Sequence, residues 1–159
     1  MNIKIVCVGK LKESYLKDAQ KEYLKRLSRF CKVEIIEVDE EKAPETAKAS
    51  QEKKVRQKEA ERIVKAFGKN TTTIALALDG KEMDSVEFSR EMQGLMTGGK
   101  SDLSFIIGSS TGLDESITKN ADYKFCLSKL TFPHQLARII LLEQIYRAYK
   151  IINNEVYHK

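Results

Sequence analysis

The end of the chain combines side chains that could act on a nucleic-acid base. Tyr157, His158 and Lys159 place an aromatic ring, a titratable imidazole and a cation next to one another. Unstacked RNA bases pack against aromatic rings, and phosphates attract basic groups. Chain ends are also frequently frayed and without a role. The tail alone therefore leaves both interpretations open.

A strongly apolar segment precedes this tail and carries further polar side chains. Between residues 133 and 152 the apolar positions exceed one helical stripe, so we expect a helix buried on two sides, within its own domain or against a partner subunit. Glu143 and Arg147 are spaced i, i+4 and could form an ion pair. Arg138 lies on the same helix, and His134 in its first turn is expected to be structural. Buried polar groups of this kind must find partners.

The sequence indicates neither a metal site nor an activated nucleophile. Cys7, Cys31 and Cys126 stand singly, two of them inside apolar strand-like runs, as is typical of core thiols. No CxxC spacing occurs, and the Asp, Glu and His residues show no metal-ligand spacing. We expect no disulfide framework, no bound metal and a reducing, cytoplasmic compartment.

Alternating strand and helix patterns must position these residues. Five short apolar runs predict strands, and the segments between and after them predict helices. The predicted strands comprise residues 3–8, 33–38, 71–78, 103–107 and 123–127. The predicted helices comprise residues 15–30, 45–67, 85–97, 114–120 and 133–152. This alternation favours one α/β domain over residues 1–159, with a mainly parallel sheet and helices on both faces.

Three loops of such a sheet are candidate ligand sites. Ligands bind beyond the C-terminal ends of parallel strands, which selects the loops after Leu78, Ile107 and Leu127. The second loop, residues 108–112, has the sequence GSSTG, whose small residues would let a backbone approach a ligand closely. It is neither a GxGxxG fingerprint nor a P-loop, and an ordinary tight turn between strand and helix would look the same.

Charge is unevenly distributed along the chain. The 159 residues include 28 Lys and Arg against 23 Asp and Glu, a net charge of +5. Seven basic residues oppose three acidic ones in residues 11–32, whereas residues 34–45 hold six acidic residues and one lysine. The segment from residue 129 onward is again basic and could face a polyanion, although a solvated mixture of charges is the alternative. No apolar run approaches the roughly 18 residues of a membrane helix.

Three motifs together resemble the ribosomal RNA large subunit methyltransferase H family. They are LALDGKEMDS at residues 76–85, FIIGSSTGL at residues 105–113 and LSKLTFPHQLARIILLEQIYRAYKIINNEVYHK at residues 127–159. Their order and spacing, the N-terminal IKIVCVGKLKE and the total length also match, so the resemblance covers the whole chain. One departure is Ser109, where members of the family usually carry a second glycine.

The resemblance implies an architecture that general rules would not suggest. Knots are nearly absent from protein folds, yet the family has the SPOUT α/β knot, a deep trefoil knot at the C-terminal end, here within about residues 71–159. It also implies a homodimer that binds S-adenosylmethionine in the knot, mostly through backbone groups. Matched by motif, the cofactor contacts fall on Leu76, Gly108, Leu127, Ser128, Lys129, Leu130, Thr131 and Phe132.

The implied reaction is methylation of N3 of a pseudouridine in 23S ribosomal RNA. The sequence leaves free RNA, the large subunit and the assembled ribosome open as substrates, and the small domain without appended RNA-binding machinery favours the assembled ribosome. Direct displacement needs no covalent enzyme intermediate, which agrees with the missing nucleophile. We expect His158 to handle the N3 proton, Tyr157 to orient the base and Lys159 to engage phosphate or developing charge. Arg138 is a second candidate for stabilising charge. The tail of one subunit could complete the site of the other.

Two other functions compete with this one. A catalytically silent, ribosome-associated RNA-binding module could keep the same fold, but all three cofactor-loop motifs and the YHK terminus are present. A dinucleotide-dependent enzyme is disfavoured because no GxGxxG follows the first strand and no acidic residue is suitably spaced.

Overall fold

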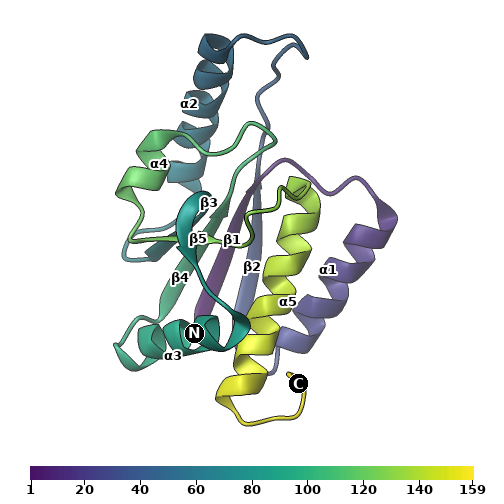
Figure 1. The fold of residues 1–159 in the computed structure, drawn as a ribbon, viewed down its shortest axis with the longest axis vertical. Coiled ribbons are helices and arrows are strands. Elements are labelled where there is room, and N and C mark those ends of the chain that lie inside the picture. Colours follow the sequence, from purple (N-terminus) through teal and green to yellow (C-terminus); the bar gives the residue numbers. More distant parts are fainter.

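A five-stranded parallel sheet forms the centre of the computed structural model, which describes residues 1–159 (Figure 1). The strands lie in the order β2-β1-β4-β3-β5, and every pairing is parallel. The strands are β1 (Asn2–Val8), β2 (Lys32–Val38), β3 (Thr72–Glu82), β4 (Asp102–Ile107) and β5 (Tyr123–Cys126). The helices are α1 (Ser14–Leu27), α2 (Ala49–Ala66), α3 (Ser85–Thr97), α4 (Glu115–Asn120) and α5 (His134–Ile152). The predicted parallel α/β class is confirmed.

Helices cover both faces of the sheet because its central strands are apolar on both sides. In β1, Ile3 and Ile5 belong to the core beneath α1, α3 and α5, whereas Val6 and Val8 pack with α2 and α4. Successive strand side chains point to opposite faces, so one continuous apolar run supplies both cores. Figure 1 shows α1 and α5 on one side of the sheet and α2 and α4 on the other.

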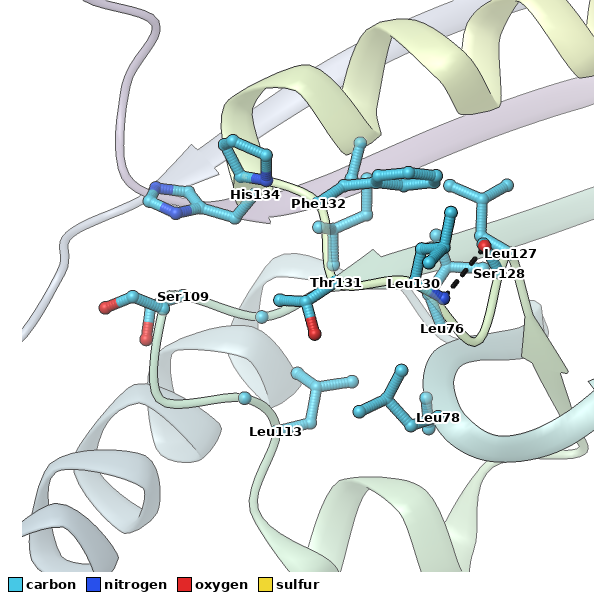
Figure 2. A pocket seen from close by; sticks show the side chains of 17 residues that line it. Leu76, Leu78, Ser109, Leu113, Leu127, Ser128, Leu130, Thr131, Phe132 and His134 are labelled. Carbon is cyan, nitrogen blue, oxygen red and sulfur yellow. Dashed lines mark hydrogen bonds between the residues drawn. The ribbon is translucent and has the colours of Figure 1, made fainter.

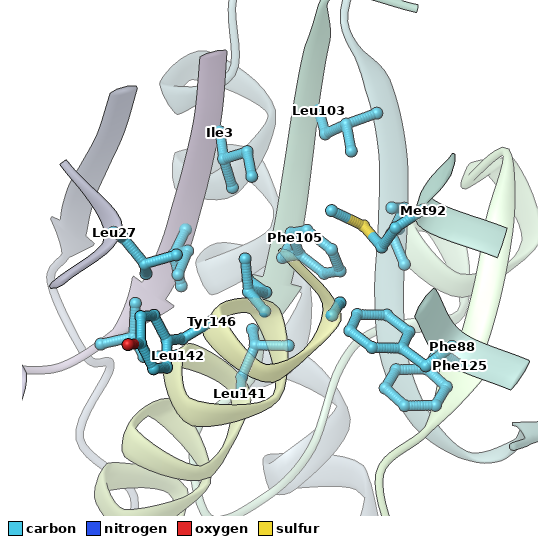
Figure 3. Close-up of a cluster of buried hydrophobic side chains, with 14 of the residues drawn as sticks. Ile3, Leu27, Phe88, Met92, Leu103, Phe105, Phe125, Leu141, Leu142 and Tyr146 are labelled. Atoms are coloured by element: carbon cyan, nitrogen blue, oxygen red, sulfur yellow. The ribbon is translucent and has the colours of Figure 1, made fainter. Parts of the chain in front are cut away.

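Helix α5 is buried by its own chain. It packs on the sheet between α1 and α3, and Leu141, Leu142 and Ile145 are completely inaccessible to solvent. Figure 3 shows Leu141 and Leu142 among the core side chains. Beside it, the rings of Phe88 and Phe125 stack with centroids 5.1 Å apart and an interplanar angle of 8°. The nearly all-round apolar pattern of this helix therefore has an intrachain explanation. No helix of the structure combines the length and apolar character that crossing a membrane would require.

Several predicted helix ends differ from the structure: α1 ends at Leu27 and not at residue 30, and a turn closed by the Ala47 N–H and the Pro44 carbonyl at 2.9 Å precedes α2. Helix α2 begins at Ala49 and not at residue 45, with Lys48 as its N-cap; the backbone N–H of Lys48 donates to the Gln51 side chain at 2.9 Å. Helix α5 begins at His134, so Pro133 is the N-cap residue and not the first helical one. The one-residue difference at Pro133 is common at helix ends, whereas the four residues before Ala49 lie outside the helix.

Strand β3 continues to Glu82, past Leu78, where the predicted strand ends. Phe125 of β5 pairs with both Leu76 and Lys81, so residues 77–80 leave the ladder and β3 resumes after them. A Cβ on Gly80 would lie 2.7 Å from the backbone N and C of Phe125, which only glycine tolerates. This excursion turns residues 77 and 78 toward the edge of the sheet where the candidate loops lie.

Candidate functional site

A pocket of about 550 Å³ opens at the C-terminal edge of the sheet (Figure 2). Its walls are the excursion of β3, the loop after β4, the loop after β5 and the first turn of α5. These walls include the three loops predicted from the sequence as candidate ligand sites, which lie together because parallel strands end at a common edge of the sheet. The volume lies within the range of small-molecule sites, about 300–1,000 Å³.

The pocket is apolar and nearly free of charge. Among its lining residues His134 is the one with an acid–base side chain, and the others are aliphatic, aromatic, small or hydroxylated. Burial lowers the pKa of His134, an effect that Glu40 opposes and Arg138 reinforces. The imidazole is therefore mainly neutral at neutral pH. A pocket of this kind selects its ligand by shape and by backbone hydrogen bonds more than by charge.

The loop after β5 offers many such backbone groups. Residues 127–132 form no backbone–backbone hydrogen bond, and the one side-chain bond to their main chain joins the Leu130 N–H to Ser128 Oγ at 3.0 Å (Figure 2). Backbone N–H and C=O groups normally have partners. This loop thus presents a series of donors and acceptors along one wall of the pocket.

The loop after β4 is shaped by backbone-to-backbone contact. A Cβ on Gly108 would lie 2.7 Å from the carbonyl carbon of Gly112, whose own φ is +85°. The Gly112 N–H donates to the Ser109 carbonyl at 2.9 Å and closes the turn. Small residues here are required by the turn itself, in addition to any close approach of a ligand.

The structure brings together all but one of the residues predicted to contact a cofactor. Lys129 is the exception: its side chain is exposed and its Nζ lies 3.5 Å from the carboxylate of Glu82. Sequence reasoning missed His134 and Leu113, although both lie within the quoted motifs. The predicted residues that line the pocket are Leu76, Gly108, Leu127, Ser128, Leu130, Thr131 and Phe132.

The C-terminal tail docks on the far end of α5. The Tyr157 hydroxyl donates to Glu143 at 3.2 Å, and the Tyr157 ring packs edge-on against Tyr146 with centroids 5.0 Å apart. Arg147 pairs with Glu143, as predicted, lies over the Tyr157 ring and approaches His158 Nδ1 at 3.1 Å. Figure 1 places the C-terminus away from the first turn of α5.

The tail is therefore remote from the pocket of its own chain. The pocket reaches Ala137 of α5, whereas His158 contacts Arg147, ten residues further along the helix. At 1.5 Å per residue this separation is about 15 Å.

Arg138 joins neither the pocket lining nor the tail. Its side chain is 2% exposed and donates to Glu37 at 2.8 Å, to Gln20 at 3.2 Å and to the Gly9 carbonyl at 3.2 Å. These bonds fasten the beginning of α5 to the ends of β1 and β2 and to α1. Its geometry is that of an internal brace, which differs from the charge-stabilising role expected from the sequence.

Comparison with known proteins identifies the family. Residues 1–158 match a family model described as "Predicted SPOUT methyltransferase". The chain belongs to the SPOUT methyltransferase family. Proteins named ribosomal RNA large subunit methyltransferase H are 55% identical in Ruminiclostridium cellulolyticum, 54% in Clostridium kluyveri and 52% in Clostridium tetani, each over the full length of both chains.

A solved structure supports the fold of this SPOUT methyltransferase independently of close sequence similarity. The probable methylase family protein of Haemophilus influenzae aligns with a TM-score of 0.55 at 14% identity, over 99% of this chain and 70% of that one. At this identity the likeness concerns the fold alone.

Cys7 and Cys31 of this SPOUT methyltransferase are not poised as nucleophiles. Burial raises the pKa of Cys7 to about 11 and also raises that of Cys31, so both stay protonated thiols at neutral pH. No group of three or more His, Cys, Asp or Glu side chains is arranged to hold a metal ion.

Proposed function

We propose that this methyltransferase transfers a methyl group from S-adenosylmethionine to N3 of a pseudouridine in 23S ribosomal RNA. The observation that carries the proposal is the backbone of residues 127–132, which forms no hydrogen bond to other backbone groups and lies along a neutral pocket of suitable volume. The names of the relatives, which specify the large-subunit RNA, support the choice of substrate. Ribosomes as substrate also imply a cytoplasmic location.

The pocket residues fit this methyl donor. S-adenosylmethionine supplies an electrophilic methyl group on a sulfonium. The backbone of residues 127–132 would bind the adenine edge, and Leu76, Leu127 and Phe132 would enclose its faces. Because Gly108 has no side chain, the loop after β4 can pack closely on itself and leave room for the donor. We propose that the knot expected within residues 71–159 is present and holds these loops together.

A second copy of the chain would complete the site. The tail lies about 15 Å along α5 from its own pocket, so we propose a homodimer in which each tail reaches the partner's pocket. Leu78 and Leu130 line the pocket yet remain 66% and 72% exposed, and Leu136 is exposed close by. An apolar rim of this kind is suited to a protein interface.

Within that composite site we assign roles to the tail residues. His158 would accept the N3 proton, Tyr157 would orient the base and Lys159 would neutralise phosphate or developing negative charge. Glu143 and Arg147 would hold Tyr157 and His158 through the contacts described above. Arg138 would act indirectly, by fixing the start of α5 beside the pocket.

Methyl transfer to ribosomes tests the proposed function directly. Ribosomes that lack the modification, offered with labelled S-adenosylmethionine, should become labelled, and already modified ribosomes should not. Free 23S RNA and isolated large subunits, tested in parallel, identify the form of RNA that is recognised. A silent RNA-binding module would bind these particles and leave every one of them unlabelled.

The exposed face of α1 is expected to contact RNA phosphates. Lys21 and Lys25 are exposed and form no ion pair, whereas Arg26 pairs with Glu22 and Arg29 with Glu155. Replacing both lysines by glutamine should weaken ribosome binding and flatten the plot of log K against log salt by about one to two, since each phosphate contact contributes about 0.7–0.9.

A matched pair of lysines on the opposite face of the sheet serves as the control. Lys53→Gln with Lys54→Gln on α2 makes the same charge change at exposed positions. Filter binding of ribosomes over a salt series should give this pair the slope of the unchanged protein. If the slope of log K against log salt were also unchanged for the Lys21 and Lys25 variant, these lysines would contact solvent and not RNA phosphates.

A further inference from the structure

A buried carboxylate joins three segments behind the pocket. Glu59 of α2 is 2% exposed. Its Oε1 accepts a hydrogen bond from Ser109 Oγ at 2.9 Å, and its Oε2 accepts one from the backbone N–H of Glu41 at 3.1 Å. One side chain therefore connects α2, the loop after β4 and the segment that follows β2.

This carboxylate is buried without an ion-pair partner. Arg62, one turn further along α2, instead donates to the Glu41 carboxylate at 2.6 Å and to the Asp39 carbonyl at 2.9 Å. Burial raises the pKa of Glu59, an effect that the two hydrogen bonds only partly oppose. A buried carboxylate without a cation generally contributes less to stability than an apolar residue of similar volume. Fold stability alone does not explain an acidic residue at this position.

What Glu59 holds is the loop that forms one wall of the pocket. Ser109 is 7% exposed, follows Gly108 directly and lies at the edge of the pocket (Figure 2). Its hydroxyl also lies 3.0 Å from that of Thr111, whose carbonyl accepts a hydrogen bond from Arg56 at 3.5 Å. The side of the loop away from the pocket is thus tied to α2 by side chains.

We infer that Glu59 is a positioning residue for the methyl-donor pocket, which it stabilises by holding residues 108–112 in place through Ser109. The inference rests on the proposed function, since it concerns the affinity for S-adenosylmethionine. The hydroxyl of Ser109 matters because a glycine, the usual residue of the family at this position, could not donate this side-chain bond.

Two variants test the link, each by titration calorimetry with S-adenosylmethionine and by thermal unfolding. Glu59→Met keeps the helix propensity and most of the volume but removes both acceptors. We expect about a tenfold weaker affinity with an unchanged or higher unfolding midpoint, a combination that a purely structural role would not produce. Ser109→Ala should weaken binding about three- to fivefold.

The double variant tests whether the two residues act through one interaction. If they do, Glu59→Met with Ser109→Ala binds no more weakly than Glu59→Met alone. Ile63→Val on α2 is the control: Ile63 is buried in the core between α2 and the sheet and touches no loop hydrogen bond. It should lower the unfolding midpoint and leave the affinity unchanged.

The outcomes separate the inference from the proposed function. If the unchanged protein binds no S-adenosylmethionine, the proposed function fails and the inference fails with it. If it binds, but Glu59→Met stays within twofold, the inference alone is overturned. Multiplicative losses in the double variant would also overturn it, because the residues would then act independently.

Discussion

Removing Tyr157, His158 and Lys159 abolishes methyl transfer to ribosomes while the affinity for S-adenosylmethionine stays within about threefold. The expectation follows from the separation of functions along α5. The donor pocket involves the first turn of the helix, whereas the tail docks near Glu143 and Arg147. Loss of a general base alone typically costs about 10²–10⁴ in rate.

Single substitutions divide this effect among the tail residues. His158→Gln should lower kcat by about 10²-fold or more, since glutamine does not accept a proton at neutral pH. Tyr157→Phe is the matched mild change: the ring still packs on Tyr146, and only the hydrogen bond to Glu143 is lost. We expect it to retain activity within about tenfold, the worth of one such bond.

The measurements are single-turnover methyl transfer and titration calorimetry, with thermal unfolding to establish that the shortened chain is folded. A shortened protein that methylates ribosomes at the normal rate would reduce the tail to a structural element. Loss of donor binding in parallel with transfer would instead place the tail within the donor site itself.

Replacing Gly108 by alanine weakens S-adenosylmethionine binding by about 10- to 100-fold. The new Cβ would lie 2.7 Å from the Gly112 carbonyl carbon and 2.8 Å from its oxygen, so the loop backbone must move. Forcing extra volume into a packed site costs about 1–3 kcal/mol, and each 1.4 kcal/mol corresponds to a tenfold change in affinity. Calorimetry with the donor measures the loss.

Gly94 offers a matched control for the same substitution. It lies on the exposed side of α3, and a Cβ there would meet no atom within 4 Å. Gly94→Ala should raise stability by about 0.5–1 kcal/mol, because alanine restricts the unfolded chain and favours the helix, and should leave donor affinity unchanged. If Gly108→Ala bound the donor as tightly as Gly94→Ala, the loop would have to relax without reshaping the pocket.

Periodic patterns in the sequence were sufficient to predict the helices and strands and the edge of the sheet at which the pocket lies. Residues 3–8 and 103–107 became buried central strands because a continuous apolar run can be covered by helices on both faces of the sheet. The strand-end rule then selected the loops that line the pocket of the structure, without knowledge of any ligand. The assignments of individual cofactor contacts came from motif resemblance and stay predictions. The exposed side chain of Lys129 lies beside Glu82, so a contact at this position would be made by its backbone.

The other structural features could not be predicted, because they arise from contacts between residues far apart in the sequence. Neither the excursion of β3 against Phe125 nor the bracing role of Arg138 is marked by any local pattern, because each partner lies far away along the chain. The same applies to Glu59, which looks like one more charge on a polar helix until packing buries it beside Ser109.

Composition and spacing were thus enough for the class of fold, the pocket edge and the chemical character of the tail. Tertiary packing decided that the tail folds back onto α5 beside Glu143 and Arg147, about 15 Å along the helix from the pocket. The helix itself follows from local sequence preferences, whereas the docking of the tail rests on contacts between residues 11 and 14 positions apart, which no helical or strand periodicity encodes.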